Sequence, residues 1–272
     1  MLELCTLASG SSGNCLLASD GTTHLLIDAG ISARRICKSL RALGVEPAGL
    51  SGILITHEHS DHIGGLATLS MGKVAPAAWV ILLCLPVYAS RGTALQLCYR
   101  IAFLEDVIHP FQAAGAFSIG SLGITSFPTP HDSADSVGYT LTDGRRKAAV
   151  ATDLGHLTPA VSAGIAGAHL LVCEANHDVE WLRCGPYPYF LKQRILGDRG
   201  HLSNEAGAAL ACAAVEGGAQ TVVLAHLSAE NNTPVRAYDT VHAALSGRGV
   251  AVGRDVTLEV APRSEPGRRY CV

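Results

Sequence analysis

The 272 residues of the chain are enough to bury one large hydrophobic core, and no linker, repeat or low-complexity tract divides them. Apolar residues make up 48% and charged residues 16%, which excludes a disordered chain. The net charge of −3 is not the overall basic charge typical of nucleic-acid-binding proteins, so such a function would need a local cluster of cations. We expect a single domain over residues 1–272.

The beginning of the chain and its cysteines predict a cytoplasmic protein. Met1–Cys5 lacks the basic segment of a secretory signal peptide and continues directly into a strand-like pattern. The nine cysteines are scattered without a CxxC pair, as expected for free thiols in a reducing compartment. The apolar stretch Val74–Ala89 contains Pro76 and Pro86 and is too short to cross a bilayer, so we expect no contact with a membrane.

The first half of the chain is rich in predicted strands, which are apolar, β-branched runs between turn residues. These strands are Leu2–Ala8, Asn14–Ser19, Thr23–Asp28, Gly52–Thr56, Trp79–Ala89, Ile124–Phe127, Val137–Thr142 and Ala148–Thr152. A helix is predicted at Ala33–Leu43, because Gly44 is a typical C-terminal signal, and a second helix begins near Ile63.

In the second half, predicted strands and helices alternate. Strands are predicted at His169–Glu174 and Gln220–Ala225, and a helix at Ser203–Val215. Two further helices begin at Thr158-Pro159 and Thr233-Pro234, because Thr is a good N-cap and Pro a good first helical residue. They run to about residues 167 and 245. Strands first and alternation later predict two facing sheets with helices outside, an α/β sandwich.

The segment Thr56–His62, with the sequence THEHSDH, is the densest group of metal-binding side chains. It lies between a predicted strand and a predicted helix. Alternate residues of an extended loop share a side, so His57 and His59 can bind one ion together. Asp61 and His62 then turn toward a second position. Imidazole and carboxylate ligands suit Zn, Mn or Fe ions.

One loop cannot complete two coordination spheres, so we expect further ligands at distant strand ends. His131 follows the strand that ends at Phe127, Asp153 follows the strand that ends at Thr152, and His226 follows the strand that ends at Ala225. Each one alone is equally consistent with an ordinary buried polar residue. Together with the first motif they make seven ligands, enough for two ions with one bridging carboxylate.

Several blocks of sequence resemble the metallo-β-lactamase superfamily, whose fold is a four-layer αβ/βα sandwich. More narrowly, the chain resembles the YycJ/WalJ family of metal-dependent exonucleases. The His-x-His-x-Asp-His block is specific for the superfamily, whereas Gly10–Asn14, Asn176–Asp178 and Gly200–Asn204 indicate the narrower family. Other matching blocks are Ala8–Cys15, Leu26–Gly30, Pro130–Asp132, Val137–Tyr139, Ala151–Gly155 and His226–Pro234.

The resemblance implies two divalent ions, Zn or Mn, and a role for each ligand. The ligands of the first ion would be His57, His59 and His131; those of the second would be Asp61, His62 and His226, with Asp153 bridging the two. Bound ions lower the pKa of water toward 7 for attack on a phosphodiester. Asp61 would also take part in catalysis, and Asp28 would orient the metal-binding loop from behind.

The resemblance also implies that Glu174 and His201 assist catalysis, because related phosphodiesterases keep a Glu and a His at these places. A positioned imidazole can protonate the leaving oxygen. The alternative is a histidine bonded to backbone at the start of a helix, beside the predicted N-cap Ser203. Candidate substrate contacts are Ser11, Asn14, His177, Lys192 and Arg194. The alternative is a simple hairpin turn for Ser11 and Asn14 and a solvated surface for Lys192 and Arg194.

The implied function is a two-metal phosphodiesterase that acts on DNA as a 5′→3′ exonuclease. One alternative is a small-molecule hydrolase of the same fold, a thioesterase or lactonase, which the mild acidity of the chain favours. A second alternative is a non-catalytic binding module, which would lack some of the metal ligands. A nuclease needs cations beside the metal site, so the position of the basic segment around Lys192 and Arg194 discriminates between nuclease and small-molecule hydrolase.

Overall fold

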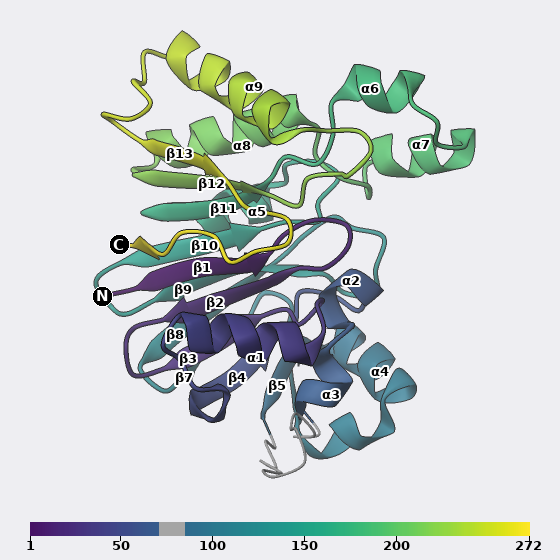
Figure 1. Ribbon diagram of the computed structural model, residues 1–272, viewed down its shortest axis with the longest axis vertical. Coiled ribbons are helices and arrows are strands. Elements are labelled where there is room, and N and C mark those ends of the chain that lie inside the picture. The colour runs from purple at the N-terminus through teal and green to yellow at the C-terminus, as the bar shows by residue number, and fades with distance from the viewer. Residues whose placement is uncertain (71–84) are drawn as a thin grey trace.

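The computed structural model describes residues 1–70 and 85–272, whose strands form two sheets of seven (Figure 1). The first sheet contains Glu3–Ala8 (β1), Cys15–Ser19 (β2), His24–Ile27 (β3), Leu50–Leu54 (β4), Val87–Ser90 (β5), Ile108–Phe111 (β6) and Tyr270–Cys271 (β14), in the order β14-β1-β2-β3-β4-β5-β6. The second contains Ala116–Ile119 (β7), Leu122–Pro128 (β8), Val137–Thr142 (β9), Lys147–Ala151 (β10), Leu170–Glu174 (β11), Thr221–Ala225 (β12) and Thr257–Val260 (β13), in the order β13-β12-β11-β10-β9-β8-β7.

Helices cover the outer face of each sheet, which confirms the four-layer αβ/βα sandwich. The first sheet packs against Ala33–Ala42 (α1), Leu66–Ser70 (α3) and Arg91–Arg100 (α4). The second packs against Pro159–Ile165 (α5), Asn204–Glu216 (α8) and Pro234–Gly247 (α9). The short elements are Pro47–Gly49 (η1), Ser60–Ile63 (α2), Ala102–Asp106 (η2), Val179–Cys184 (α6) and Tyr189–Leu196 (α7). In the described parts of the chain, no helix is long and apolar enough to cross a membrane.

The central strands are apolar on both faces because each sheet is buried on both sides. In β11, Leu170 and Val172 pack between the sheets, whereas Leu171 and Cys173 pack against the outer helices. This two-residue alternation explains why β11 is a continuous apolar run in the sequence. Full burial of each such Leu or Val stabilises the fold by about 1.5–3 kcal/mol. Tyr139 of β9 adds a polar link between the sheets, since its hydroxyl donates a 2.6 Å hydrogen bond to the carbonyl of Ile55.

Most of the predicted elements are confirmed, and β9 has the predicted bounds. The strand β4 ends two residues before the predicted Thr56, and α2 begins at Ser60 instead of near Ile63, so Asp61 and His62 lie inside the helix. Residues 79–84 of one predicted strand lie outside the described residues. The sequence prediction missed β6, β7, β13, β14, α4, α6 and α7. Of these, β6 and β7 are short, half-exposed strands at sheet edges, where the apolar pattern is weak.

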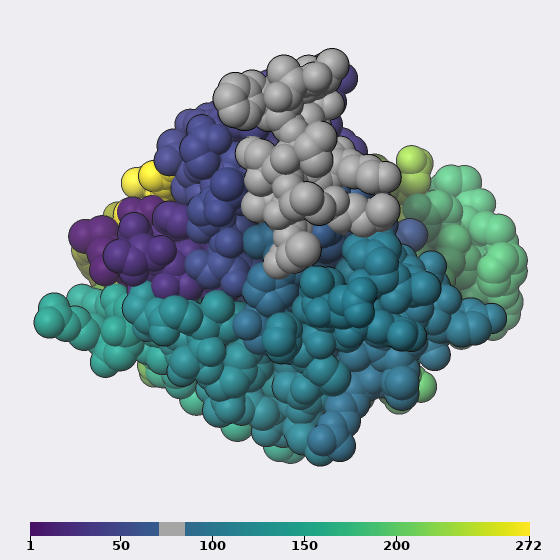
Figure 2. Space-filling view, turned by 90° about the horizontal axis from the view of Figure 1, so that it is seen from below, coloured from purple at the N-terminus to yellow at the C-terminus, as the bar shows by residue number. Residues whose placement is uncertain are grey.

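The direction of the strands places the functional residues. The strands β3, β4 and β5 are parallel in the first sheet, and β10, β11, β12 and β13 are parallel in the second. Their carboxyl ends therefore meet along one edge of each sheet. The two helices α6 and α7 project beyond the sheets at one end of the molecule (Figures 1 and 2).

Candidate metal centre

All seven predicted ligands come together at the carboxyl ends of the strands. The segment after β4 supplies four of them, and segments after β8, β10 and β12 supply one each. The candidate ligand atoms form overlapping groups within which they lie no more than 4.8 Å apart: His57, His59 and His131; Asp61, His62 and His226; His57, His62 and Asp153; and Asp153, Glu174, His201 and His226. The structure thus brings Glu174 and His201 to the same place as the ligands.

Three site residues that follow strands have left-handed backbone. Asp28, Asp153 and His226 have φ angles of 61°, 58° and 57°, and they are the residues other than glycine with positive φ in the described chain. This conformation is uncommon, although Asp, Asn and His tolerate it better than most residues. Such strained residues concentrate at functional sites, where the surrounding structure holds them. Here the backbone of His226 is held by Ser9, whose hydroxyl accepts its N–H at 2.8 Å.

In the first group of ligands, the ring nitrogens have distinct partners. The Nδ1–H of His131 donates to the carbonyl of Gly200 at 3.1 Å, and Nδ1 of His57 lies 3.0 Å from the Thr56 hydroxyl. Nε2 of His131 lies 3.3 Å from Nδ1 of His59, and Nε2 of His57 is buried without a hydrogen-bond partner among the described residues. Two ligand nitrogens on one tetrahedral zinc ion, with bonds of about 2.0–2.1 Å, are separated by about 3.3 Å. These residues fit a metal ion.

The second group has similar spacing. Oδ2 of Asp61 lies 3.5 Å from Nε2 of His62 and 3.5 Å from Nε2 of His226. Oδ2 of Asp153 lies 3.4 Å from Nε2 of His62 and has no hydrogen-bond partner among the described residues. The Asp153 carboxylate also lies 3.9 Å from Nε2 of His131 in the first group. The Asp153 carboxylate therefore lies between the two groups.

Asp28 holds one of the candidate ligands, His62, from behind the site. Its carboxylate is buried and accepts the Nδ1–H of His62 at 2.7 Å and the backbone N–H of Thr56 at 2.8 Å. With Nδ1 held by Asp28, Nε2 is the His62 nitrogen that faces Asp61 and Asp153.

Burial and neighbouring charges set the protonation of the cluster. Burial, together with the nearby His62 and His131, holds the pKa of His57 well below its usual value, so its imidazole is neutral. Burial opposes the ionisation of Asp61, but hydrogen bonds from His226 and His62 outweigh it and hold the pKa of this carboxyl well below its usual range. Burial opposes the charged forms of His62 and His226, but the neighbouring carboxylates outweigh it and raise the pKa of both histidines, that of His226 to about 10. Neutral imidazoles and ionised carboxylates are the forms that bind a divalent cation, so a cation held by His62 and His226 would displace a proton from each.

Glu174 organises two histidines from inside the second sheet. This fully buried carboxylate accepts the Nδ1–H of His201 at 2.8 Å and that of His226 at 2.8 Å through Oε1. Its Oε2 accepts the backbone N–H groups of Leu154 and Leu202. The His201 imidazole is thus bonded to a carboxylate rather than to backbone, which argues against the purely structural interpretation. His201 lines the cleft, with Nε2 available to a ligand.

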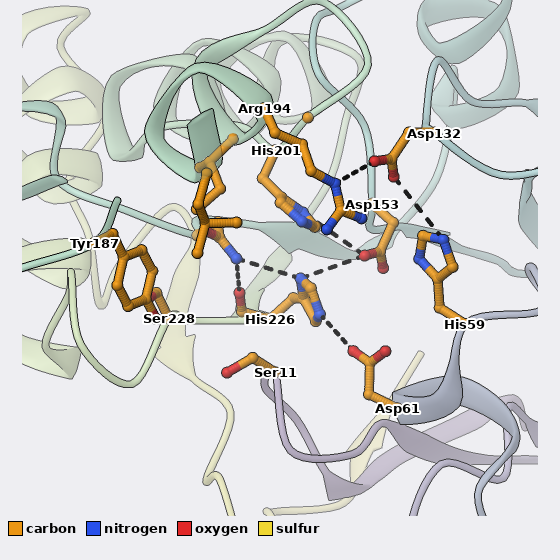
Figure 3. Close-up of a pocket in the computed structure, with 14 residues that line it drawn as sticks. Ser11, His59, Asp61, Asp132, Asp153, Tyr187, Arg194, His201, His226 and Ser228 are labelled. Atoms are coloured by element: carbon orange, nitrogen blue, oxygen red, sulfur yellow. Dashed lines mark hydrogen bonds and ion pairs between the residues drawn. The ribbon is translucent and has the colours of Figure 1, made fainter. Parts of the chain in front are cut away.

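A cleft opens over the ligands (Figure 3). Two of the five predicted substrate contacts, Ser11 and Arg194, line it. The Arg194 guanidinium, half-exposed, donates to the carboxylate of Asp132. The full lining consists of Ser11, His59, Asp61, Asp132, Asp153, Asn176, Tyr187, Leu191, Arg194, Ile195, Gly200, His201, His226 and Ser228.

The other three predicted substrate contacts lie outside this lining. Asn14 is buried behind the ligands, where its amide donates to Asp61 at 3.4 Å and lies 3.1 Å from Nε2 of His62. His177 is also buried, and burial lowers its pKa to about 4. Lys192 lies in a different hollow, and its ammonium donates to the carbonyl of Arg183 at 2.7 Å. Side-chain direction, which sequence position alone does not reveal, accounts for all three differences.

Sequence analysis missed several residues of the lining. Asp132 could have been found from its position next to His131, and its carboxylate lies 3.4 Å from Nε2 of that histidine. Asn176 belongs to a family block and donates to the carbonyl of His226 at 2.8 Å. Nothing in the sequence pointed to Leu191 and Ile195, which lie on the unpredicted helix α7, or to Tyr187, which lies just before it. Ser228 also lines the cleft.

Comparisons with known proteins show which proteins this chain is similar to. A family model described as the beta-lactamase superfamily domain matches residues 23–227. The exodeoxyribonuclease YycJ of Bacillus anthracis is 36% identical over 253 residues, covering 93% of this chain and 92% of that protein. The exodeoxyribonuclease WalJ of Streptococcus pneumoniae is 36% identical over 253 residues, covering 92% and 90%. The crystal structure of Zn²⁺-bound PqqB from Methylobacterium extorquens has a TM-score of 0.69 at 20% identity and covers 99% of this chain and 100% of that one.

We predict that Asp153→Asn loses bound metal together with activity. Asn tolerates the left-handed backbone at this position, so the change removes the negative charge with little disturbance of the fold. The test is metal analysis of the purified variant beside Asp239→Asn, an exposed change on α9 that should keep the parental metal content. Parental metal content and affinity in Asp153→Asn would exclude the bridging role.

Proposed function

Because the chain belongs to the metallo-β-lactamase superfamily, and within it to the YycJ/WalJ family, we propose that this metal-dependent hydrolase digests DNA from the 5′ end. The observation that carries the proposal is the Glu174–His201 pair: the buried Glu174 holds His201, which lines the cleft together with the predicted ligands Asp61, Asp153 and His226. Curated relatives named exodeoxyribonucleases match almost the whole chain, which favours DNA over a thioester or lactone substrate. We take residues 1–272 to be a single domain.

We propose two divalent ions, Zn or Mn, as cofactors. The first would be held by His57, His59 and His131, the second by Asp61, His62 and His226, and Asp153 would contact both. When bound, such ions lower the pKa of water toward 7 and offset the negative charge of a phosphoryl group. The 3.3 Å between His131 Nε2 and His59 Nδ1 supports the first site, and the 3.5 Å from Asp61 to His62 and to His226 supports the second. Nε2 of His57 and Oδ2 of Asp153, which have no hydrogen-bond partner among the described residues, support both.

The residues around the ions supply proton transfer and orientation. Glu174 accepts the Nδ1–H of His201 and so orients the ring with Nε2 toward the cleft. His201 can then give the Nε2 proton to the leaving oxygen of the phosphodiester. Asp61 is the more exposed of the two ligand carboxylates, with 23% of its side chain accessible against 3% for Asp153. Asp61 can therefore also orient the attacking water.

Arg194 is the cation through which the cleft would bind a phosphate. It is the single Arg or Lys among the described residues that line the cleft. Its partner Asp132 uses part of the guanidinium, and the half-exposed remainder offers further N–H donors. The net charge of −3 by itself does not attract DNA, so Arg194 would be the local cation that holds the strand.

We predict that His201→Ala keeps both metals but slows DNA cleavage by about 10²-fold or more, as expected for the loss of a general acid. A phosphodiester with a better leaving group should be affected much less, because its departure needs less protonation. His242→Ala on α9, away from the cleft, is the control and should have the parental rate. Equal losses on both substrates would indicate that His201 only positions the substrate.

We predict that Arg194→Gln weakens binding to single-stranded DNA and flattens its salt dependence. Gln removes the charge but can still donate to Asp132, so the ligand loop keeps its support. The slope of log K against log[salt] should fall by about 0.7, the contribution of one phosphate contact on a single strand. Binding titrations over a range of salt measure this slope. The control is Arg248→Gln, whose guanidinium pairs with Glu216 on α8; equal slopes in both variants would contradict the contact.

A further inference from the structure

The side of the cleft that α7 forms is apolar. Tyr187, Leu191 and Ile195 line it, and the last two lie four residues apart on α7, so they share one face of the helix. In Figure 3, Tyr187 lies across the cleft from Asp61 and His59. None of these three side chains belongs to a hydrophobic core of the described residues. Their apolar surface faces the cleft and is available to a ligand.

This apolar wall is fixed relative to the reacting groups. The backbone N–H of His201 donates to the carbonyl of Ile195 at 3.0 Å. Arg199 donates to the carbonyl of His131, with Nε at 2.9 Å. Gly200 permits the close approach, because a Cβ at this position would lie 2.1 Å from the Ile195 carbonyl oxygen. The wall therefore keeps its position with respect to both His201 and the ligand His131.

Core packing does not explain why the chain forms α7 here. The helix has no buried residue, and its Tyr189 and Phe190 are 77% and 72% exposed. It is connected to the site through its C-terminal end, as described above. Before α6, the backbone N–H of Asp178 donates to the carbonyl of Asn231 at 2.9 Å. A surface helix that is tied to the active-site loops and contributes little to the core is best explained by binding.

We propose that Tyr187, Leu191 and Ile195 form a subsite on which the terminal nucleobase of a DNA strand stacks. This inference rests on the proposed function and names its substrate more closely. Every base has a flat apolar face that stacks on an aromatic ring, so the wall accepts any base. Arg194 lies on the same side of α7, where it can contact the phosphate of the same strand. A base inside a strand is stacked on both faces, whereas the terminal base has one free face that it can offer to this wall.

The test compares two variants with the parent on two substrates. Tyr187→Ala removes the ring, and Tyr187→Phe keeps it as the matched control. With single-stranded DNA, Tyr187→Ala should raise KM by about 5-fold to 100-fold, as expected for one lost base–aromatic stack, whereas Tyr187→Phe should resemble the parent. With the same strand lacking its terminal base, the parent should already have a high KM, and Tyr187→Ala should raise it no further.

The outcomes separate this inference from the proposed function. Parental metal content and Tm in Tyr187→Ala establish that the variant is folded. Failure of the parent to cleave any DNA would overturn the proposed nuclease itself. Cleavage of DNA by the parent, together with equal KM for parent and Tyr187→Ala on the intact strand, would overturn only the base subsite.

Discussion

The buried carboxylate of Asp153 is the group on which the site depends. It lies between the loops of the two sheets, and its oxygens are 3.4 Å from His62, 3.5 Å from His226 and 3.9 Å from His131. Burial disfavours its ionisation, but His226 and His62 outweigh burial and keep the pKa of Asp153 below its usual value. An ionised carboxylate buried among imidazoles is stable only if cations compensate it. The charged forms of His62 and His226 can do so, and divalent ions bound by the same residues would take their place.

Each sheet contributes one further carboxylate that orients histidines. Asp28 follows β3 of the first sheet and fixes the tautomer of His62. Glu174 ends β11 of the second sheet and fixes His226 and His201. The two sheets thus have matching roles, since the strand ends supply rigid acceptors and the loops supply the imidazoles. Interactions of this kind decide which nitrogen faces the ion or the substrate.

Local patterns in the sequence were enough to predict the layers of the fold and the residues that come together at the site. The group His57–His62 is dense enough to recognise alone, and Asp153 and His226 come directly after or close to the end of apolar strands. The assignment of the seven residues to two separate ions came from the family resemblance and is still a proposal. Side-chain direction was not predictable: Lys192 and Arg194 are two residues apart, yet only Arg194 lines the cleft. The helix α7 buries no residue, so it leaves no apolar pattern to detect.

The most direct test of the central claim is anomalous X-ray scattering from crystals of the metal-loaded protein, collected at the absorption edge of Zn or Mn. We expect two peaks per chain, each about 2.0–2.2 Å from the donor atoms of its group, with the Asp153 carboxylate in contact with both. A single peak, or peaks bound by residues outside the seven ligands, would contradict the two-metal site on which the proposed mechanism depends.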